Sequence, residues 1–473
     1  MLKTNHTRIV GLFVGPILFG LVIFSPINGL DILPKFVLGI ALWMASWWIT
    51  VAVPLYGTSL IPLILFPILG IENVENVFLS YVDKIVLLFF GGFLLAKAIE
   101  LSNLHKRFAL NILKTFGTKP KHLVGAFIIV TASLSAWLTN TATTLLILPI
   151  AIAVIAHVQD SDEKSRFGTC LMLCVAYSAS LGGLATLIGT PPNALFASMS
   201  ESLAGLEVSF VQWMIIGVPV SAISLLVLWF CMVNFAKLGN QPIAGTREVI
   251  VEELSKIGKM MRDEKIVTII FVLTAIAWIS RGLLWKEYFP FIEDYTIVLI
   301  AATVLLVLPS SGKHKRLLDL KSAKKIPWGV LVLIGGGLAL AGGFTASGLD
   351  MWMADQLSFV GGMSYLLIIL VVVAVTIFSG ELMSNTAGAA LLMPIMASLA
   401  TTIDLNPILL ITPVAIATSY GFIMPVGTPP NAIVLGSGYV TTKNMAKFGL
   451  PLNLISILLL TVLMTTLLPL IWK

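Results

Sequence analysis

The sequence predicts an all-α polytopic membrane protein built from an inverted repeat, and three observations support this fold class. First, 58% of the 473 residues are hydrophobic and only 11% are charged, whereas a soluble domain carries about 25% charged residues. Second, apolar runs of the length needed to cross a bilayer, about 20 residues, recur from residue 8 to residue 472. Third, polar patterns of the first half return in the same order in the second. We expect about 11 transmembrane helices and two re-entrant hairpins, with a cytoplasmic N-terminus.

The N-terminal segment, 1–84, is predicted to form scaffold helices. Its apolar stretches predict spans at 9–25, 34–50 and 55–72. Residues 85–209 are expected to form the first core of the inverted repeat, which opens with a span at 85–101. In residues 103–122, apolar positions at helical spacing alternate with Lys106, Arg107 and Lys114. This pattern is typical of an amphipathic helix that lies on the membrane surface.

Two interrupted apolar stretches follow in the first core. Residues 123–157 carry polar side chains at their centre, and each flanking arm is shorter than the roughly 20 residues that a crossing needs. This favours a re-entrant hairpin whose tip lies near the middle of the membrane. Residues 167–202 form a long span that must open at Pro191 and Pro192, because proline donates no backbone hydrogen bond.

The second half repeats this order. Residues 210–327 are predicted to form scaffold helices at 210–235, 266–285 and 294–309, with charged cytoplasmic loops at 237–265 and 310–327. A second core at 328–435 contains a span at 328–345, a hairpin at 362–403 and a broken helix at 408–435. A C-terminal helix lies in the last segment, 436–473. Matched blocks in the same order indicate an internal duplication.

The basic residues predict how the two halves are oriented. With a cytoplasmic N-terminus and alternating spans, most of the 29 Lys and Arg residues fall in cytoplasmic segments. The exceptions are Lys35, Lys84, Lys97, Arg281, Lys286 and Lys473. The span at 85 then starts outside and its partner at 328 starts inside, so the halves are inverted repeats, as in secondary transporters.

Four short motifs carry the chemistry of the predicted site. Thr139-Asn140-Thr141-Ala142 and Ser384-Asn385-Thr386-Ala387 lie at the hairpin centres, and Gly-Thr-Pro-Pro-Asn-Ala occurs at 189–194 and again at 427–432. Asn and Thr side chains can satisfy open backbone groups and offer donors to a ligand. Helix N-termini favour carboxylate or phosphate oxygens, while unwound carbonyls and hydroxyls suit Na⁺. We therefore expect the four segments to meet in one substrate and ion site inside the membrane.

Several other residues bear on the class of protein. Glu381, in the second hairpin, is interpreted either as a functional carboxylate or as a structural group bonded to nearby hydroxyls. Lys97 is placed to snorkel at the end of its span. Gly91-Gly92 and Gly335-Gly336-Gly337 predict close helix packing. The chain has no HExxH, P-loop or Ser-His-Asp order, so we expect no enzyme activity, no catalytic residues and no organic cofactor. Basic residues spread over short loops argue against nucleic-acid binding.

The paired motifs at Asn140 and Asn385, the two Gly-Thr-Pro-Pro-Asn-Ala segments and Trp47-Trp48-Ile49 resemble the divalent anion/sodium symporter (DASS) family. That family includes bacterial dicarboxylate and citrate carriers and 2-oxoglutarate/malate translocators. The resemblance covers nearly the whole chain. It implies a homodimer in the plasma (inner) membrane, with a scaffold and a transport domain that moves like an elevator. The substrates it implies are di- or tricarboxylates of the succinate, malate, 2-oxoglutarate and citrate class.

The resemblance also implies roles for individual residues. Its substrate contacts would be Asn140, Thr141, Thr190, Pro191, Asn385, Thr386, Thr428 and Pro429. A first sodium site would use Ser135, Thr139, Asn140 and Gly189, and a second would use Gly380, Met383, Asn385 and Gly427.

The second implied sodium site departs from the family pattern. Gly380 lacks the hydroxyl that sodium-coupled members carry at this position. Na⁺ thus stays a candidate coupling ion, and a dicarboxylate exchanger is slightly favoured over a Na⁺-coupled symporter. An anion channel is a further alternative, which the absence of charged rings near the motifs disfavours.

Overall fold

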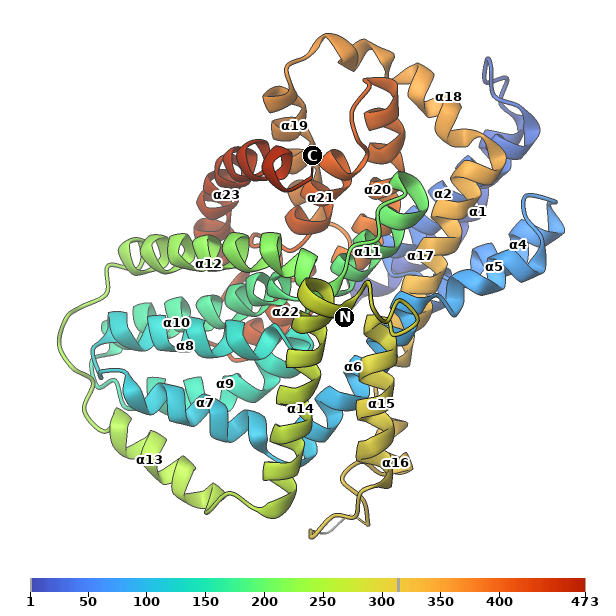
Figure 1. The fold of residues 1–473 in the computed structure, drawn as a ribbon. Coiled ribbons are helices and arrows are strands. Elements are labelled where there is room, and N and C mark those ends of the chain that lie inside the picture. Colours follow the sequence, from blue (N-terminus) through green and yellow to red (C-terminus); the bar gives the residue numbers. More distant parts are fainter. Residues whose placement is uncertain (1, 313–314, 473) are drawn as a thin grey trace.

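The computed structural model describes residues 2–312 and 315–472 (Figure 1). Lys313 and His314, in a predicted cytoplasmic loop, and Lys473 lie outside the described residues. In the described chain the regular structure is helical, apart from one isolated β-bridge between Pro309 and Arg316. Eight described helices are long and apolar enough to cross a membrane. The predicted all-α polytopic fold class is confirmed.

The N-terminal helices gather on one side of the molecule, beside α17 (Trp328–Ser347) (Figure 1). They are α1 (Leu2–Phe24), α2 (Ile32–Thr50), α3 (Leu55–Thr58), α4 (Ile61–Ile68) and α5 (Val74–Tyr81). The span predicted at 55–72 corresponds to α3 and α4, but it ends at Ile68 and is interrupted by a turn between the two helices. Pro62 has no N–H to donate to the carbonyl of Thr58, so the helix opens at this point. The carbonyl of Ser59 next to the opening accepts a hydrogen bond from the Tyr81 hydroxyl at 2.5 Å.

The first interrupted segments fold as a hairpin and a broken helix. The elements are α6 (Lys84–Leu101), α7 (Leu104–Thr115), α8 (Pro120–Ser135), α9 (Asn140–Ala156), α10 (Ser161–Gly182) and α11 (Pro191–Ala204). The hairpin arms α8 and α9 both pack against α10, and residues 136–139 form the hairpin tip. After Gly182 a short 3-10 turn, Gly183–Ala185, leads to an open segment before α11. The predicted break at Pro191 is therefore confirmed.

The predicted amphipathic helix corresponds to α7, whose 12 residues are fewer than the roughly 20 that a crossing needs. Its apolar side chains do not all face lipid, since Leu110 and Leu113 are buried where α7 packs against α8 and α13 (Thr246–Ile257). Arg107 also joins this helix to Glu264 through a two-pronged ion pair with that buried carboxylate. That α7 lies on the membrane surface stays a prediction.

The remaining elements repeat the pattern. Between the two cores lie α12 (Phe210–Phe235), α13, α14 (Arg262–Ser280), a π-helical turn (Arg281–Trp285), α15 (Asp294–Val307) and α16 (Leu320–Ala323). The second core continues from α17 through α18 (Leu349–Gln356), a 3-10 turn (Ser358–Gly362), α19 (Tyr365–Gly380), α20 (Asn385–Thr402), α21 (Ile408–Ala417) and α22 (Pro429–Leu435). The chain closes with α23 (Thr442–Ile471). The pair α19 and α20 corresponds to α8 and α9, and α21 with α22 corresponds to α10 with α11.

Glycines allow helices to approach closely in both halves, as predicted. A Cβ at Gly336 would lie 2.3 Å from the carbonyl oxygen of Ser59, and one at Gly91 would lie 2.5 Å from a methyl of Val298. Neither distance is compatible with a side chain, so α17 and α6 can pack where they do only with glycine at these positions.

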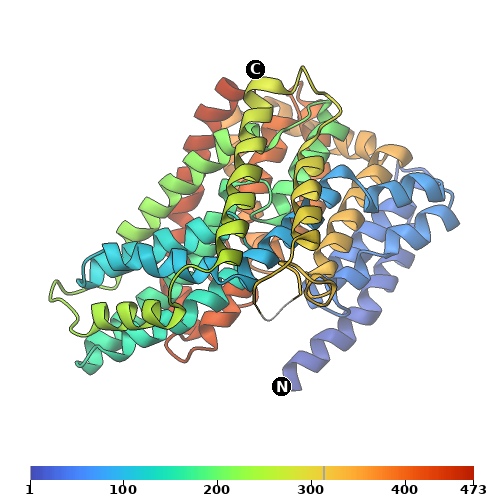
Figure 2. The same cartoon turned by 60° about the horizontal axis from the view of Figure 1, so that its bottom comes forward.

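The two ends of the chain lie at opposite ends of the bundle (Figure 2). The N-terminus and the loop between α15 and α16 lie at one end, and the C-terminus lies at the other (Figure 2). This relative arrangement agrees with the predicted topology, in which the N-terminus and residues 310–327 share the cytoplasmic side. Which end is cytoplasmic stays a prediction.

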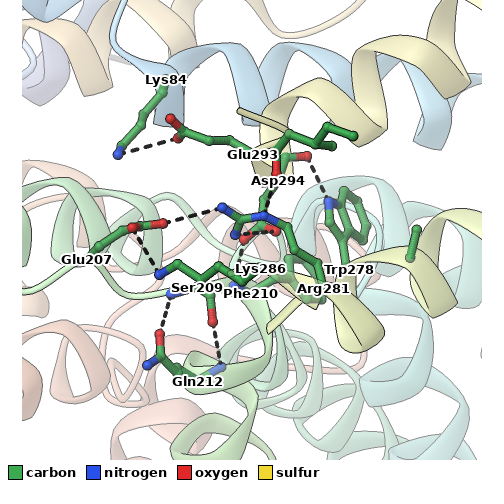
Figure 3. A network of polar contacts seen from close by, with 12 residues as sticks. Lys84, Glu207, Ser209, Phe210, Gln212, Trp278, Arg281, Lys286, Glu293 and Asp294 are labelled. Carbon is green, nitrogen blue, oxygen red and sulfur yellow. Dashed lines mark hydrogen bonds and ion pairs between the residues drawn. The ribbon is translucent and has the colours of Figure 1, made fainter. Parts of the chain in front are cut away.

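Three exceptions to the charge rule, Lys84, Arg281 and Lys286, meet in one ionic network (Figure 3). The pairs are Lys84–Glu201 at 2.8 Å, Lys84–Glu293 at 3.4 Å, Arg281–Asp294 at 3.2 Å, Arg281–Glu207 at 3.6 Å and Lys286–Glu207 at 2.9 Å. The acidic partners offset the positive charge, so these cations are compatible with an external location. Burial opposes the charged form of Glu207, but Lys286, Lys84 and Arg281 outweigh it and lower the pKa of this carboxyl.

Candidate functional site

The two hairpin tips are built alike. Thr139 is the N-cap of α9, and its side chain accepts a hydrogen bond from the backbone N–H of Ala142 at 3.3 Å. Ser384 caps α20 in the same way, accepting from Ala387 at 3.3 Å. Asn140 and Asn385 are therefore the first residues of helices that start at the tips. Helix starts leave backbone N–H groups open and carry partial positive charge, which suits an anion.

The two helix breaks are braced by one repeated interaction. The Asn193 side-chain amide donates to the carbonyl oxygens of Gly183 at 3.0 Å and Thr186 at 2.8 Å. The Asn431 amide donates in the same way to Gly421 at 2.9 Å and Met424 at 3.0 Å. Both asparagines are fully buried. Sequence reasoning assigned them no role, although their recurrence as the fifth residue of each Gly-Thr-Pro-Pro-Asn-Ala segment was the available signal.

Oxygen atoms converge at the first tip. The Ser135 hydroxyl lies 2.8 Å from Asn140 Oδ1 and 2.6 Å from the carbonyl oxygen of Ala179. A Cβ at Gly183 would lie 2.7 Å from Asn140 Oδ1 and 3.1 Å from the carbonyl oxygen of Gly189, so glycine leaves space beside both. One hydroxyl proton serves two acceptor oxygens here, which leaves acceptor capacity for a cation. Ser135, Asn140 and Gly189 of the predicted first sodium site thus lie together and fit Na⁺.

Thr139, the fourth residue predicted for this site, caps a helix instead. Its side-chain oxygen faces the backbone of Ala142 as the helix cap. The cap fixes the start of α9 and so the direction of Asn140, the residue that follows it.

The second tip lacks the matching hydroxyl. Gly380 stands where Ser135 stands in the first hairpin, and Asn385 Oδ1 is buried without a hydrogen-bond partner among the described residues. Gly427 does lie close to this tip, because a Cβ on it would be 3.2 Å from the Gly380 carbonyl oxygen and 3.4 Å from Glu381 Oε2. Gly380, Asn385 and Gly427 therefore supply oxygens or space, while Met383 is a buried side chain of the tip.

The Glu381 carboxylate accepts four hydrogen bonds, three of them from the second break. Its carboxylate accepts from the backbone N–H groups of Phe422 at 2.8 Å, Ile423 at 2.9 Å and Met424 at 2.8 Å. The side-chain amide of Asn453 on α23 adds a fourth bond at 2.7 Å. Glu381 is buried. The structural interpretation of Glu381 is therefore supported, although its partners are three backbone N–H groups and the Asn453 side-chain amide, and not the predicted hydroxyls.

Several contacts join the two halves. The helix pairs α9–α22 and α11–α20 pack across the repeat boundary. The Tyr177 hydroxyl on α10 donates to the carbonyl oxygen of Phe422 in the second break at 2.6 Å, and the two rings lie 4.6 Å apart.

The predicted substrate contacts differ in exposure. Asn140, Thr141, Pro191 and Asn385 are half-buried, Thr190, Thr386 and Thr428 are buried, and Pro429 is exposed. Thr428 caps α22 by accepting from the Asn431 N–H at 3.4 Å. A cavity of about 580 Å³ reaches Thr139 and Thr141 at the first tip. That all eight residues share one substrate pocket stays a prediction.

Comparisons with known proteins agree with this architecture. The chain is 41% identical to the sodium-dependent dicarboxylate transporter SdcS of Staphylococcus saprophyticus over 479 aligned positions. The alignment covers 98% of this chain and 92% of SdcS. SdcS of Staphylococcus aureus is 38% identical over 478 positions, with the same shares. These relatives are transporters and not enzymes, which agrees with a multi-pass protein of the plasma membrane.

Two solved structures share the fold at 14% sequence identity. MtrF of Neisseria gonorrhoeae, described within a class of antimetabolite efflux pumps, has a TM-score of 0.60 and matches 85% of this chain and 83% of its own. The YdaH transporter of Alcanivorax borkumensis has a TM-score of 0.51, over 85% and 90% of the two chains. The family model described as "Sodium:sulfate symporter transmembrane region" matches residues 6–472. The chain therefore belongs to the sodium:sulfate symporter family, the divalent anion/sodium symporters that its motifs resemble.

Proposed function

We propose that this protein is a secondary transporter that moves di- or tricarboxylates of the succinate, malate, 2-oxoglutarate and citrate class, coupled to Na⁺. The observation that carries this proposal is the oxygen cluster of Ser135, Asn140 and Ala179 at the start of α9. These neutral oxygens share a single hydroxyl proton, so they keep free lone pairs that suit a hard monovalent cation. A cation bound there would lie beside an open helix N-terminus, where a substrate carboxylate is also favoured.

Coupling to Na⁺ is preferred here over exchange. The loss of a hydroxyl at Gly380 favoured an exchanger slightly, but the relatives at 41% and 38% identity are both named sodium-dependent dicarboxylate transporters. The first oxygen cluster is intact, and the second tip keeps the Asn385 oxygen and nearby backbone carbonyls. The Na⁺-coupled alternative therefore explains more of the observations than exchange does.

The substrate would be held without a basic side chain next to the motifs. The tips offer instead the amide groups of Asn140 and Asn385, threonine hydroxyls and open backbone N–H groups. These groups recognise carboxylates in general, so they support a class of substrates and not one member of it.

Transport would follow an elevator-like movement in a homodimer. The braces formed by Asn193, Asn431 and Glu381 tie each break loop into its own half. The tips and breaks can then move as one rigid body, with the site kept intact. The homodimer is proposed from the resemblance to the family.

Uptake into proteoliposomes tests the function. We expect labelled succinate to accumulate when Na⁺ is outside and to stay near background when choline replaces Na⁺. Vesicles preloaded with unlabelled succinate, tested without Na⁺, measure exchange separately. Uptake that ignores Na⁺ but needs internal dicarboxylate would establish the exchanger, and a lack of both activities across succinate, malate, 2-oxoglutarate and citrate would overturn the proposed function.

A further inference from the structure

The cavity that reaches the first tip has two different walls. One wall belongs to the hairpin and includes Thr139 and Thr141. The other belongs to α6 and to the segment before α17, and it includes Lys97, Glu100 and Lys325. Residues 310–327 are predicted to be cytoplasmic, so the cavity connects the predicted cytoplasmic end of the protein with the start of α9.

The cavity wall supplies the fixed cations that the tips lack. Lys325 is exposed and no ion pair joins it to a described residue. Lys97 is only 16% exposed and pairs with Glu100 at 2.8 Å, while the Glu100 carboxylate is 53% exposed. His105 also lines the cavity, and burial lowers the pKa of its imidazole, which disfavours a positive charge on this ring. Two lysines against one glutamate leave the wall with a net positive charge.

Lys97 therefore does more than snorkel. An ammonium group with little solvent contact gains from a carboxylate partner, and its present partner, Glu100, is itself well solvated. A substrate carboxylate that enters the cavity can take the place of Glu100 at low cost. Positively charged clefts with apolar walls also raise the local concentration of an anion and its rate of entry, by roughly 10-fold or more.

We propose that this cavity is the cytoplasmic vestibule of the transporter, in which Lys97 and Lys325 capture the carboxylate dianion before it reaches Thr141. The inference rests on the proposed function and adds two substrate-capturing residues outside the motifs. The lysines then assist substrate entry from the cytoplasmic face only, because the cavity wall belongs to the predicted cytoplasmic end. Glu100 then weakens substrate binding in the cavity, since its carboxylate competes with the substrate for Lys97.

Membrane vesicles of opposite sidedness test this proposal. Initial rates of labelled succinate uptake are measured in inside-out vesicles, where substrate enters from the cytoplasmic face, and in right-side-out vesicles. We expect Lys325→Ala and Lys97→Met each to raise the KM by about 3–10-fold in inside-out vesicles and to leave right-side-out vesicles unchanged. Glu100→Gln should lower the KM by about 2-fold in inside-out vesicles. Lys324→Ala is the matched control, because Lys324 is an exposed neighbour that does not line the cavity.

Two further features separate charge capture from a structural effect. Raising the ionic strength from about 0.02 M to about 0.5 M should remove most of the difference between Lys325→Ala and the wild type, since exposed charges are then screened. A structural defect would not give opposite signs for Lys97→Met and Glu100→Gln. Equal effects in both kinds of vesicle, or a Lys325→Ala variant that matches Lys324→Ala, would overturn the proposal. If the wild type transports no carboxylate in either kind of vesicle, the proposed function itself fails.

Discussion

The hydroxyl of Ser135 lies 2.8 Å from the side-chain oxygen of Asn140. The second hairpin has glycine, Gly380, at the position that corresponds to Ser135, and Asn385 Oδ1 is buried there without a hydrogen-bond partner among the described residues. The two tips are thus similar in backbone and unequal in oxygen supply. We therefore expect substitutions at the two tips to change the Na⁺ requirement in different ways.

Removing the hydroxyl of the first tip should weaken coupling. Ser135→Ala deletes one of the oxygens that converge beside Asn140, and we expect the Na⁺ concentration for half-maximal succinate uptake to rise about 10-fold, or about 1.4 kcal/mol. The measurement is the Na⁺ dependence of initial uptake in proteoliposomes. Ser133→Ala is the control, because Ser133 lies on the same helix and lines a different cavity. An unchanged Na⁺ dependence in Ser135→Ala would remove this residue from the cation site.

Restoring a hydroxyl at the second tip should strengthen coupling. The added Cβ of Gly380→Ser would meet nothing nearer than the Thr418 carbonyl oxygen at 3.7 Å, which is an ordinary contact. The new hydroxyl can serve the unpaired Asn385 oxygen and a cation, as Ser135 does in the first half. We expect about a 3–10-fold lower Na⁺ requirement, about 0.7–1.4 kcal/mol, with an unchanged melting temperature. Gly380→Ala, which adds the Cβ without the hydroxyl, should behave like the wild type. If both variants shift the Na⁺ requirement equally, the hydroxyl is not the cause.

The two asparagine braces should be equally important for stability. Asn193→Ala and Asn431→Ala each remove the two hydrogen bonds that a buried side-chain amide donates, which costs about 1–3 kcal/mol. Thermal unfolding of the purified protein should show the loss in both variants. Asn234→Ala is the control, since Asn234 is exposed and its side-chain amide donates to the carbonyl oxygen of Phe230 on its own helix. A brace variant that unfolds like this control would show that its loop is held by other contacts.

The ionic network should make stability depend on pH in acid. The pKa of Glu207 is lower in the folded protein than in the unfolded chain, so its ionised form stabilises the fold above the ordinary glutamate pKa of about 4.3. This contribution is lost as the pH falls through the lowered, folded-state value. We expect Glu207→Gln to melt below the wild type at pH 7, and the gap to close below about pH 4.

Glu252→Gln provides the comparison for this pH series. Glu252 forms an exposed pair with Lys256 at 3.0 Å, and exposed pairs contribute little, about 0–1 kcal/mol. Its melting temperature should follow the wild type at every pH. A gap between Glu207→Gln and the wild type that persists unchanged to pH 3 would show that ionisation of Glu207 is not what stabilises the network.

Local signals predicted the hairpins and the breaks, because their causes lie in adjacent residues. Thr139 and Ser384 interrupt apolar runs as helix caps, and Pro191 lacks an N–H. The interruption between α3 and α4 has a local cause as well, in Pro62. It was missed because apolar length alone predicted a span at 55–72.

The roles of Glu381 and the braces could not be predicted, because their partners are remote in sequence. Glu381 bonds to Phe422, 41 residues away, and to Asn453, 72 residues away. The asparagine braces need carbonyl groups that become available only after the preceding helix has stopped. Periodicity shows where a helix ends, but it does not show which buried donor meets the carbonyls that the ending leaves open.

The central claim is that both hairpin tips contribute to one substrate and ion site. The most direct test is thermal stabilisation of the purified protein by succinate, with and without Na⁺. At a concentration of about 100 times the dissociation constant, binding adds about 2.7 kcal/mol to the wild type. We predict that Asn140→Ala and Asn385→Ala each remain folded and each lose this Na⁺-dependent stabilisation, while Asn234→Ala keeps it. Wild-type stabilisation in either tip variant would contradict a site shared by the two halves.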